Sequence, residues 1–193
     1  LTLLNLQETD PGFSRQGVVT LRIVLPDDRY QGDAAISGFH RRIVERARAV
    51  PGVIEAATVN FLPLNHETST PDFVVEGRPE PPEPWESVAF TVSPAYFKVM
   101  GIPLLRGRAF TADDGADTPA VAVVDAGLAA RVFTDDEALG ARLLLGRSRR
   151  PVTIVGVVGE AKQVDLGDRQ PLGLYLAQQQ SPWGYLRLLA RAT

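Results

Sequence analysis

Two histidines are the first residues of this chain to consider as catalytic groups or metal ligands. His40 and His66 belong to different predicted elements, and the chain has no cysteine that could complete a ligand set. A metal ion would have to be held by scattered carboxylates, which is not the ligand spacing of a protein metal site. We therefore expect His40 to lie on the polar side of a helix and His66 to lie in a loop, neither of them as a ligand.

Two acidic clusters, Asp113-Asp114 and Asp135-Asp136-Glu137, could supply the carboxylate pair of a glycosidase. One of those carboxyls would need a raised pKa, and the surrounding sequence shows no environment that would raise it. Both clusters stand beside predicted helix starts or turns, where negative charges stabilise a helix N-terminus. We expect them to act as caps.

Serines and glycines show no catalytic or phosphate-binding motif. No serine stands in a G-x-S-x-G or S-x-x-K pattern. Gly156 and Gly159 follow a predicted strand, but their spacing matches neither the dinucleotide fingerprint nor the P-loop. We expect a close approach of two backbones there instead. The sequence therefore predicts no catalytic, cofactor-binding or metal-binding residue, and no cofactor.

Three arginines, Arg147, Arg149 and Arg150, stand at the tip of a predicted hairpin. In an exposed turn such charges are solvated and need no ligand. The alternative is a contact with an anionic partner or a lipid headgroup.

Composition narrows the class of protein. The chain has 193 residues, with 20 Lys and Arg against 23 Asp and Glu, so its net charge of −3 argues against nucleic-acid binding. A chain of this length buries roughly 70% of its unfolded surface and needs no disulfide to hold a core. Its apolar runs fall far short of the roughly 20 residues that cross a bilayer.

The clearest structural signal is a β-α-β unit in the first third of the chain. Alternating apolar residues predict a strand over residues 18–25, and 53–61 predicts a second strand. Between them, Asp33 is a candidate N-cap for a helix whose apolar face includes Ile36, Ile43 and Val44, and which Pro51-Gly52 ends. The two strands and their crossover helix should form one layered unit.

The remaining elements are short, so the predicted class is α+β. The expected strands cover 73–75, 86–92, 120–124, 141–145, 152–158, 174–176 and 186–190, and the expected short helices cover 94–100 and 126–133, with Asp125 as the cap of the second. Read from its residues alone, the chain is a two-lobed domain without a visible active site.

Several segments together resemble one family. Its most specific feature is the run from Ser93 to Arg108, Ser-Pro-Ala-Tyr-Phe-Lys-Val-Met-Gly-Ile-Pro-Leu-Leu-Arg-Gly-Arg. With Asp10-Pro11-Gly12-Phe13 and the Val53–Ala57 strand after Pro51-Gly52, it resembles the extracytoplasmic core domain of MacB/FtsX-type ABC transporter permeases. The sequence of these segments most resembles that of orphan permeases that carry two such periplasmic domains.

The resemblance implies a fold of two lobes. Residues 1–17 would be a lead-in that follows a transmembrane helix, residues 18–69 and 161–193 a β-α-β porter-like lobe, and residues 70–160 an inserted small mixed α/β lobe. In the run from Ser93, the resemblance and the residue types suggest that Tyr96, Phe97 and Met100 anchor a short helix, which Gly101 ends.

The resemblance also implies a location and a role. The domain would lie at the periplasmic face of the bacterial inner membrane, transmit conformational change or contact cargo or a partner protein, and catalyse no reaction. Its partners would be a cytoplasmic ATPase subunit, reached through the membrane part, and a periplasmic partner or cargo, with a dimeric full-length protein and no nucleic acid.

One departure from the family bears on self-association. Family members continue past the last strand into a second helix and strand, whereas this sequence ends at Thr193. We expect the porter-like lobe to be truncated, with an uncovered apolar sheet face that favours dimerisation or swapping. A free-standing periplasmic module that binds a small ligand is an alternative function, and a hydrolase is a third.

Overall fold

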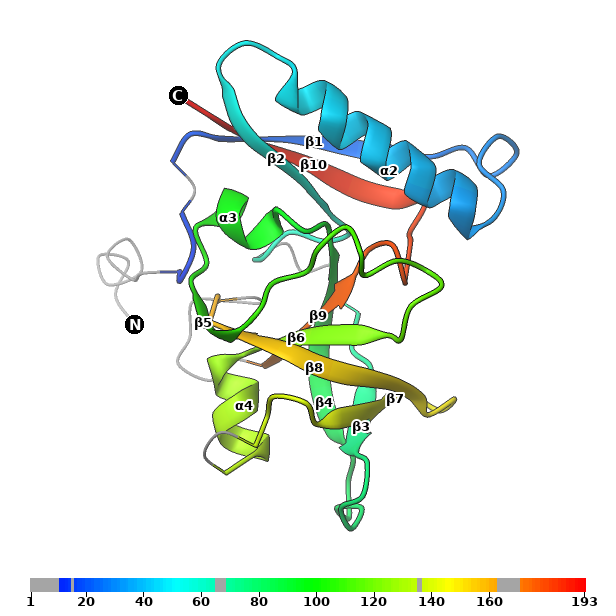
Figure 1. The fold of residues 1–193 in the computed structure, drawn as a ribbon, viewed down its shortest axis with the longest axis vertical. Coiled ribbons are helices and arrows are strands. Elements are labelled where there is room, and N and C mark those ends of the chain that lie inside the picture. The colour runs from blue at the N-terminus through cyan, green and yellow to red at the C-terminus, as the bar shows by residue number, and fades with distance from the viewer. Residues whose placement is uncertain (1–10, 15, 65–68, 135–136, 163–170) are drawn as a thin grey trace.

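The computed structural model describes residues 11–14, 16–64, 69–134, 137–162 and 171–193 (Figure 1). This part of the chain forms a mixed α/β fold, which confirms the predicted α+β class. The helices are α2 (Asp33–Arg48), α3 (Tyr96–Met100) and α4 (Ala126–Val132). The strands are β1 (Val18–Val24), β2 (Val53–Val59), β3 (Asp72–Val75), β4 (Trp85–Val92), β5 (Leu104–Gly107), β6 (Val121–Asp125), β7 (Arg142–Leu145), β8 (Arg150–Val158), β9 (Leu172–Ala177) and β10 (Tyr185–Ala192).

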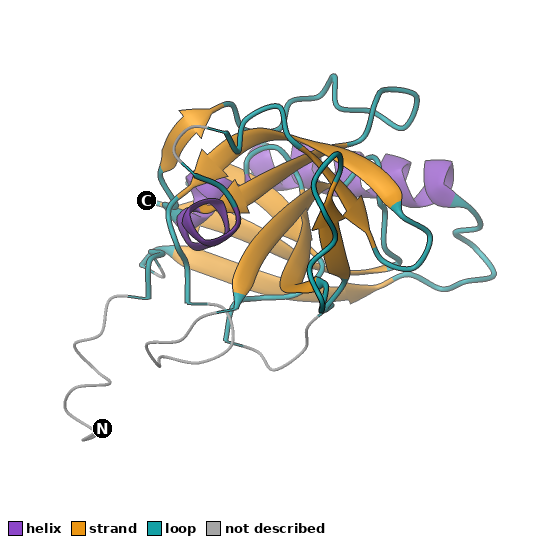
Figure 2. Ribbon diagram, turned by 90° about the horizontal axis from the view of Figure 1, so that it is seen from below, coloured by secondary structure: helices purple, strands orange, loops and turns teal. Residues whose placement is uncertain are grey.

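Six strands close into a ring. Their order is β4-β3-β7-β8-β6-β9, and β9 pairs in parallel with β4 to complete the circle. Figure 2 shows these strands as a strongly curved sheet. β5 is not one of the six ring strands. Among the described strands it pairs only with β8.

Three strands form a second, open sheet. β10 lies between β1 and β2 and is antiparallel to both, and a single residue pair, Val59 with Val92, links this sheet to the ring. Helix α2 lies across the three-stranded sheet (Figure 1) and packs Val44 against Ala56 and Leu188. The predicted β-α-β unit is therefore present, with β10 inserted between its two strands.

The ring strands β4, β6 and β9 are buried on both faces. One face carries Phe90, Val123 and Tyr175, which pack in a cluster with α3. The other face carries Ala122 and Leu174, which pack in a second cluster with α4. Such two-sided burial explains why these segments read as nearly continuous apolar runs in the sequence.

The ends of α2 and α3 test two predictions. Asp33 is the first residue of α2, not its N-cap: Gly32 holds that position at φ 78°, without a side-chain cap. The expectation of an Asp33 cap was wrong because glycine provides the left-handed turn into the helix. Gly101 ends α3 at φ 68°, as the resemblance implied.

The segment 161–193 contributes to both sheets. β10 joins β1 and β2, whereas β9 pairs with β4 and β6 of the ring. The predicted porter-like lobe grouped β9 with β1, β2 and β10, whereas in the structure β9 pairs with strands of the ring. The lobe boundaries 18–69, 70–160 and 161–193 remain a prediction.

None of the helices in the described residues is both long enough and apolar enough to cross a membrane.

Candidate functional site

His40 is buried, contrary to the expectation that it lies on the polar side of its helix. Only 2% of the residue is exposed, and its Nε2 lies 2.9 Å from the carbonyl oxygen of Trp183. Because a carbonyl only accepts, Nε2 carries the hydrogen and Nδ1 is the acceptor. Burial lowers the pKa of His40, so the ring is neutral at pH 7. The helical pattern could not reveal this, because Trp183 lies 143 positions away in the chain.

The other sequence candidates are not brought together into a catalytic group. His66, Asp135 and Asp136 lie outside the described residues. Glu137 forms an ion pair with Arg78 (2.6 Å). Within the described ranges, no three His, Asp or Glu side chains are placed to hold a metal ion.

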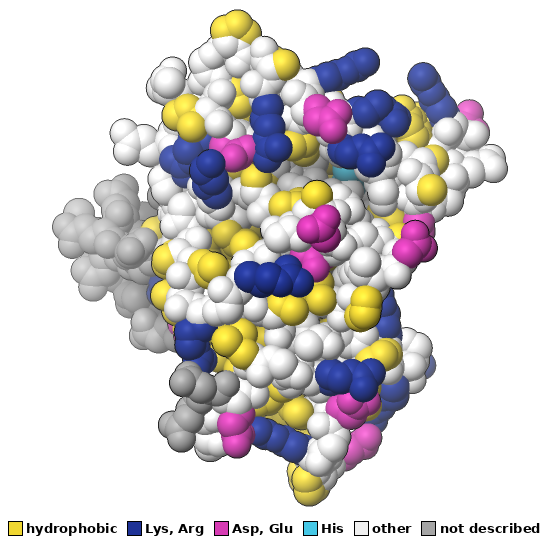
Figure 3. Space-filling model, in the orientation of Figure 1, with side chains coloured by type: hydrophobic (Ala, Val, Ile, Leu, Met, Phe, Trp, Pro, Cys, Tyr) yellow, Lys and Arg dark blue, Asp and Glu magenta, His cyan; other side chains and the backbone are white. Residues whose placement is uncertain are grey.

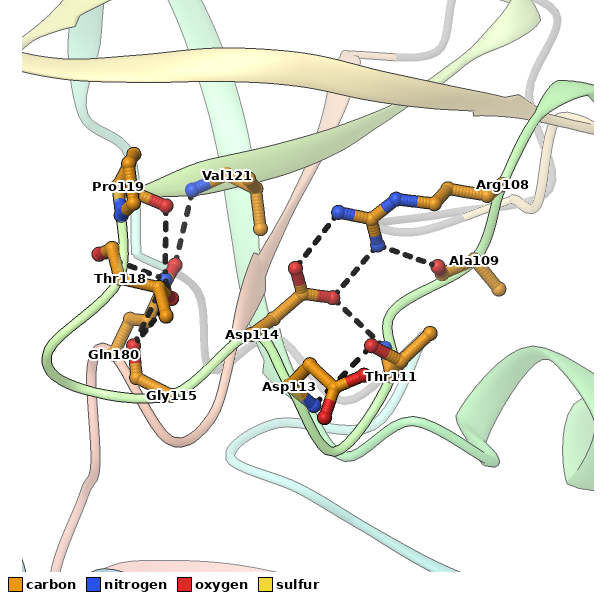
Figure 4. A network of polar contacts seen from close by, with 10 residues as sticks. All are labelled: Arg108, Ala109, Thr111, Asp113, Asp114, Gly115, Thr118, Pro119, Val121 and Gln180. Atoms are coloured by element: carbon orange, nitrogen blue, oxygen red, sulfur yellow. Dashed lines mark hydrogen bonds and ion pairs between the residues drawn. The ribbon is translucent and has the colours of Figure 1, made fainter.

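Asp114 holds a loop and does not cap a helix (Figure 4). Both of its carboxylate oxygens accept hydrogen bonds from Arg108, at 2.8 Å each, and Oδ2 also accepts one from the Thr111 amide. Burial alone would raise the pKa of Asp114, but the hydrogen bonds from Arg108 and Thr111 and the charge of Arg108 together hold that pKa below its usual range. The chain forms a turn at Asp113-Asp114, one of the two possibilities expected there, and these bonds satisfy the carboxylate locally.

Gln180 fixes the second half of the same loop (Figure 4). Its Nε2 donates to oxygens of Gly115, Thr118 and Pro119, while its Oε1 accepts a hydrogen bond from the Val121 amide at 2.9 Å. Sequence patterns could not identify this role, since one glutamine between β9 and β10 has no local signature. The loop between β5 and β6 is thereby tied to the linker that joins the ring to the open sheet.

Asp125 caps α4, as predicted, but in an unusual environment. Its Oδ1 accepts a hydrogen bond from the Leu128 amide (2.7 Å) and its Oδ2 accepts one from the Gly173 amide (2.9 Å). Burial raises the pKa of Asp125 to about 7 despite those two hydrogen bonds, and the charge of Glu160 adds to the rise. This carboxyl is therefore partly protonated near neutral pH.

The basic hairpin tip uses two of its three arginines within the chain. Arg149 pairs with Glu80 at 3.0 Å, and Arg150 donates to Ser181 Oγ and the Gln180 carbonyl. These contacts lock the tip onto neighbouring loops, so an anionic ligand is not needed to explain Arg149 and Arg150.

The predicted close backbone approach at Gly156 and Gly159 is confirmed. A Cβ at Gly156 would collide with the Arg108 carbonyl, and one at Gly159 would collide with the Pro103 ring. Opposite Gly156 in the β5–β8 ladder stands Gly107, at φ 70°. These glycines let β5 lie directly on β8.

The described part of the lead-in segment, residues 11–14 and 16–17, is attached to α3, to β10 of the open sheet and to the chain that follows β8 of the ring. The Ser14 amide donates to the Met100 carbonyl at the end of α3 (2.7 Å), and the Lys162 amide donates to the Pro11 carbonyl (2.8 Å) after β8. Arg191 of β10 donates from Nε to the Val99 carbonyl (2.9 Å) and from Nη1 to the Gln16 carbonyl (3.1 Å). A Cβ at Gly12 would collide with the Glu160 carbonyl, so only glycine permits this docking.

We call this set of contacts the lead-in clamp. One guanidinium group joins α3, β10 and the segment that enters the domain, and an arginine can do so because its donors are fixed in a planar fork. The sequence motif at Asp10–Phe13 pointed to the segment, but nothing marked Arg191 as its partner.

Comparison with known proteins places these features in a family. The family model for the MacB-like periplasmic core domain matches residues 5–189. A probable export ATP-binding/permease protein MacB from Pseudomonas entomophila is 40% identical over 74 residues, 38% of this chain and 11% of that protein. The macrolide export ATP-binding/permease protein MacB of Neisseria gonorrhoeae is 33% identical over 69 residues, 36% of this chain and 10% of that protein. These matches span about a tenth of the length of the curated relatives.

Two solved structures share the fold. The periplasmic region of MacB from Actinobacillus actinomycetemcomitans superposes with a TM-score of 0.61 at 17% identity, over 98% of this chain and 80% of that one. The extracellular domain of the noncanonic ABC-type transporter YknZ from Gram-positive bacteria gives a TM-score of 0.56 at 14% identity, over 90% of this chain and 83% of that one.

Proposed function

This chain belongs to the MacB-like periplasmic core domain family, and we propose that it is a non-catalytic domain that transmits conformational change in an ABC transporter permease. The driving force would come from a cytoplasmic ATPase, acting through a membrane part. The relatives are named as ATP-binding/permease proteins, which supports such a pairing.

The lead-in clamp is the observation that carries this proposal. A displacement of residues 11–14 and 16–17 would act at once on α3 and β10 through Arg191, and on the segment that follows β8 through the bond from the Lys162 amide to the Pro11 carbonyl. A movement of the lead-in segment would therefore be passed on to both sheets. A flexible tether would lack these bonds and would dissipate the same displacement.

A non-catalytic role fits the chemistry of the described residues. The neutral ring of His40 donates to a backbone carbonyl, and Asp114 and Glu137 are held by arginines. These side chains are used for structure, and none faces a second reactive group.

The proposal can be tested in the membrane-embedded permease that contains this chain, together with its ATPase. Spin labels at Arg46 on α2 and Ser148 on the hairpin tip, both exposed, would report the distance between the two sheets. We expect ATP to change that distance in the otherwise unaltered protein and Arg191→Gln to abolish most of the change while ATP hydrolysis continues.

Arg147→Gln is the matched control, since it removes an exposed arginine outside the clamp. An ATP-driven distance change that survives both Arg191→Gln and Gly12→Val would contradict the proposed transmission. Hydrolysis of ester or glycoside substrates by the isolated chain, abolished by His40→Asn, would contradict the non-catalytic role.

A further inference from the structure

A pocket of about 260 Å³ lies between α2 and the linker from β9 to β10. We call it the inter-sheet pocket, since it lies between α2, which packs on the open sheet, and the segments that follow β4 and β9 of the ring. Its polar lining comprises Ser37, His40, Arg41, Glu45 and Arg48 of α2, Ser93 after β4, and Gln178 and Gln179 after β9. The first three residues of the family motif, Ser93, Pro94 and Ala95, line this pocket, whereas the lead-in clamp does not involve it.

The floor of the pocket contains buried polar groups that are incompletely paired. Gln178 is 5% exposed; its Oε1 accepts a hydrogen bond from Thr58 Oγ1, while its Nε2 completes no hydrogen bond. Gln178 lies close enough to the His40 ring to act on its pKa, which it raises against the effect of burial, yet Nδ1 of the ring also lacks a completed hydrogen bond. Buried polar atoms of this kind are rare in folded proteins and call for an explanation.

Several hydrogen-bond donors line the pocket. Ser93 Oγ accepts a hydrogen bond from the Thr58 amide, which leaves its hydroxyl hydrogen able to donate into the pocket. The Gln178 amide nitrogen and the guanidinium groups of Arg41 and Arg48 are further donors. The acceptors in the lining include the Glu45 carboxylate and Nδ1 of the neutral His40. An acceptor-rich group, such as a carboxylate, therefore fits this lining.

Charge at the rim favours an anion as well. Arg48 is engaged by Glu55 at 2.6 Å, and Lys98 shares the same carboxylate at 3.1 Å. Arg41 forms no ion pair with any residue of the described ranges and is exposed. Its charge is available to a ligand at the mouth of the pocket, since a guanidinium group can bind a carboxylate in a bidentate manner.

The size of the pocket selects the kind of ligand. Pockets for drug-sized molecules hold roughly 300–1,000 Å³, so 260 Å³ suits one side chain or a small acid. The positive surface extends beyond the pocket, because Arg42 and Arg46 are also exposed on α2. Figure 3 shows Lys and Arg side chains gathered over the part of the surface where Figure 1 places α2. A ligand that uses both features must be longer than one acid.

We propose that the inter-sheet pocket binds a carboxylate side chain from an acidic segment of an extracytoplasmic partner protein, whose neighbouring carboxylates lie along the arginines of α2. This inference rests on the proposed function, since it identifies the contact through which a transmitting domain would engage its partner. A partner held by α2 and by Gln178 touches both the open sheet and the linker from the ring, and so senses their relative position.

A binding experiment on the 193-residue chain tests this inference. The probe is a fluorescent peptide of six glutamates with blocked ends, measured by anisotropy at pH 7 and low ionic strength. We expect saturable binding that weakens with salt, and no binding of the matched six-glutamine peptide. Arg41→Ala should weaken binding at least fivefold, whereas Arg147→Ala, which removes an exposed arginine from the hairpin tip, should change it less than twofold.

A second pair of variants tests the pocket without touching its arginines. Ala112 is exposed and lines the pocket, so Ala112→Glu places a carboxylate of the chain itself at the site and should reduce binding at least tenfold. Ala116→Glu, an exposed position of the same loop that does not line the pocket, is the control.

Three outcomes would overturn the inference: equal binding by the chain with Ala112→Glu and Ala116→Glu, equal binding of the glutamine peptide, or binding to phosphatidylglycerol vesicles without binding to the glutamate peptide. The last outcome would assign the arginines to a lipid surface. This solution measurement is independent of the ATP-driven distance change, so either proposal can fail while the other stands.

Discussion

At the scale of single residues, Asp125 has one property that the local sequence predicts and another that it does not. Its role as a cap could be predicted from its place between an apolar strand and a helix. Its pKa could not, because the Gly173 amide and the burial come from a strand almost 50 positions later. His40 was wrongly predicted to be a surface residue for the same reason, since its partner, Trp183, is distant in the chain.

Asp125→Asn should change the pH dependence of stability. Because folding raises the pKa of Asp125 from 3.8 to about 7, the folded state holds its proton more tightly than the unfolded state. The contribution of Asp125 to stability is therefore complete below about pH 4 and is lost as pH rises to about 7, over a range of the order of 4 kcal/mol. Asparagine stays neutral but has only one acceptor oxygen for the Leu128 and Gly173 amides, so the variant should be less stable at pH 5 and should lack the decline that the unaltered chain shows between pH 5 and pH 8.

The measurement is the free energy of unfolding from urea titrations at pH 5, 6, 7 and 8. Asp117→Asn, at an exposed position, is the control and should leave the slope unchanged. Parallel stability curves for the unaltered chain and Asp125→Asn would show that Asp125 does not titrate in this range.

At the scale of elements, periodicity predicted where the strands and helices lie in the sequence. It did not predict which strands pair with each other. The apolar runs at 120–124 and 152–158 predicted strands, and both are present; β6 is buried on two faces, and β8 is buried on two faces only from Gly156 to Val158. Nothing in either run specified that they pair in parallel with each other. The close approach of β5 to β8 at Gly107 and Gly156 is easier to predict from the local sequence, since glycine in a strand suggests a close backbone approach.

Gly156→Ala should separate β5 from β8. The added methyl group meets the Arg108 carbonyl, which is backbone and cannot rotate away. We expect a loss of about 1–3 kcal/mol in the free energy of unfolding, typical of overpacking. Faster amide hydrogen exchange at Arg108, whose amide donates to the Val155 carbonyl, should accompany that loss.

Gly184→Ala is the matched control. A Cβ there has open space and its backbone conformation suits any residue, so its stability should stay within about 0.5 kcal/mol. A Gly156→Ala variant as stable as Gly184→Ala would show that β5 adapts without strain.

At the scale of the whole molecule, the open sheet leaves apolar surface uncovered. Val19 and Leu21 of β1 are 65% and 55% exposed, since α2 packs on β2 and β10 but leaves much of β1 bare. β1 has no second neighbour among the described strands. This exposure agrees with the uncovered apolar sheet face predicted from the sequence. The residues involved could not be identified without knowing which strands α2 covers.

This surface should cause self-association of the 193-residue chain. We expect a concentration-dependent increase in weight-average mass by sedimentation equilibrium, because an exposed apolar edge strand favours pairing between copies. Leu21→Lys should return the chain to a monomer. Val50→Lys alters an exposed valine in the turn after α2 and should not. A chain that stays monomeric at all concentrations, or association unaffected by Leu21→Lys, would contradict this expectation.

The position of β10 has a consequence for how the chain reaches its native state. Val18 pairs with Arg191, 173 positions later, and until β10 arrives β2 has only the Val59–Val92 pair to join it to another described strand. Closing so long a loop early is unfavourable, and folds dominated by distant pairs form slowly. The ring can close once β9 is present, whereas the open sheet must wait for the last strand. The surface on which α2 rests, and with it one wall of the inter-sheet pocket, is therefore assembled late in folding.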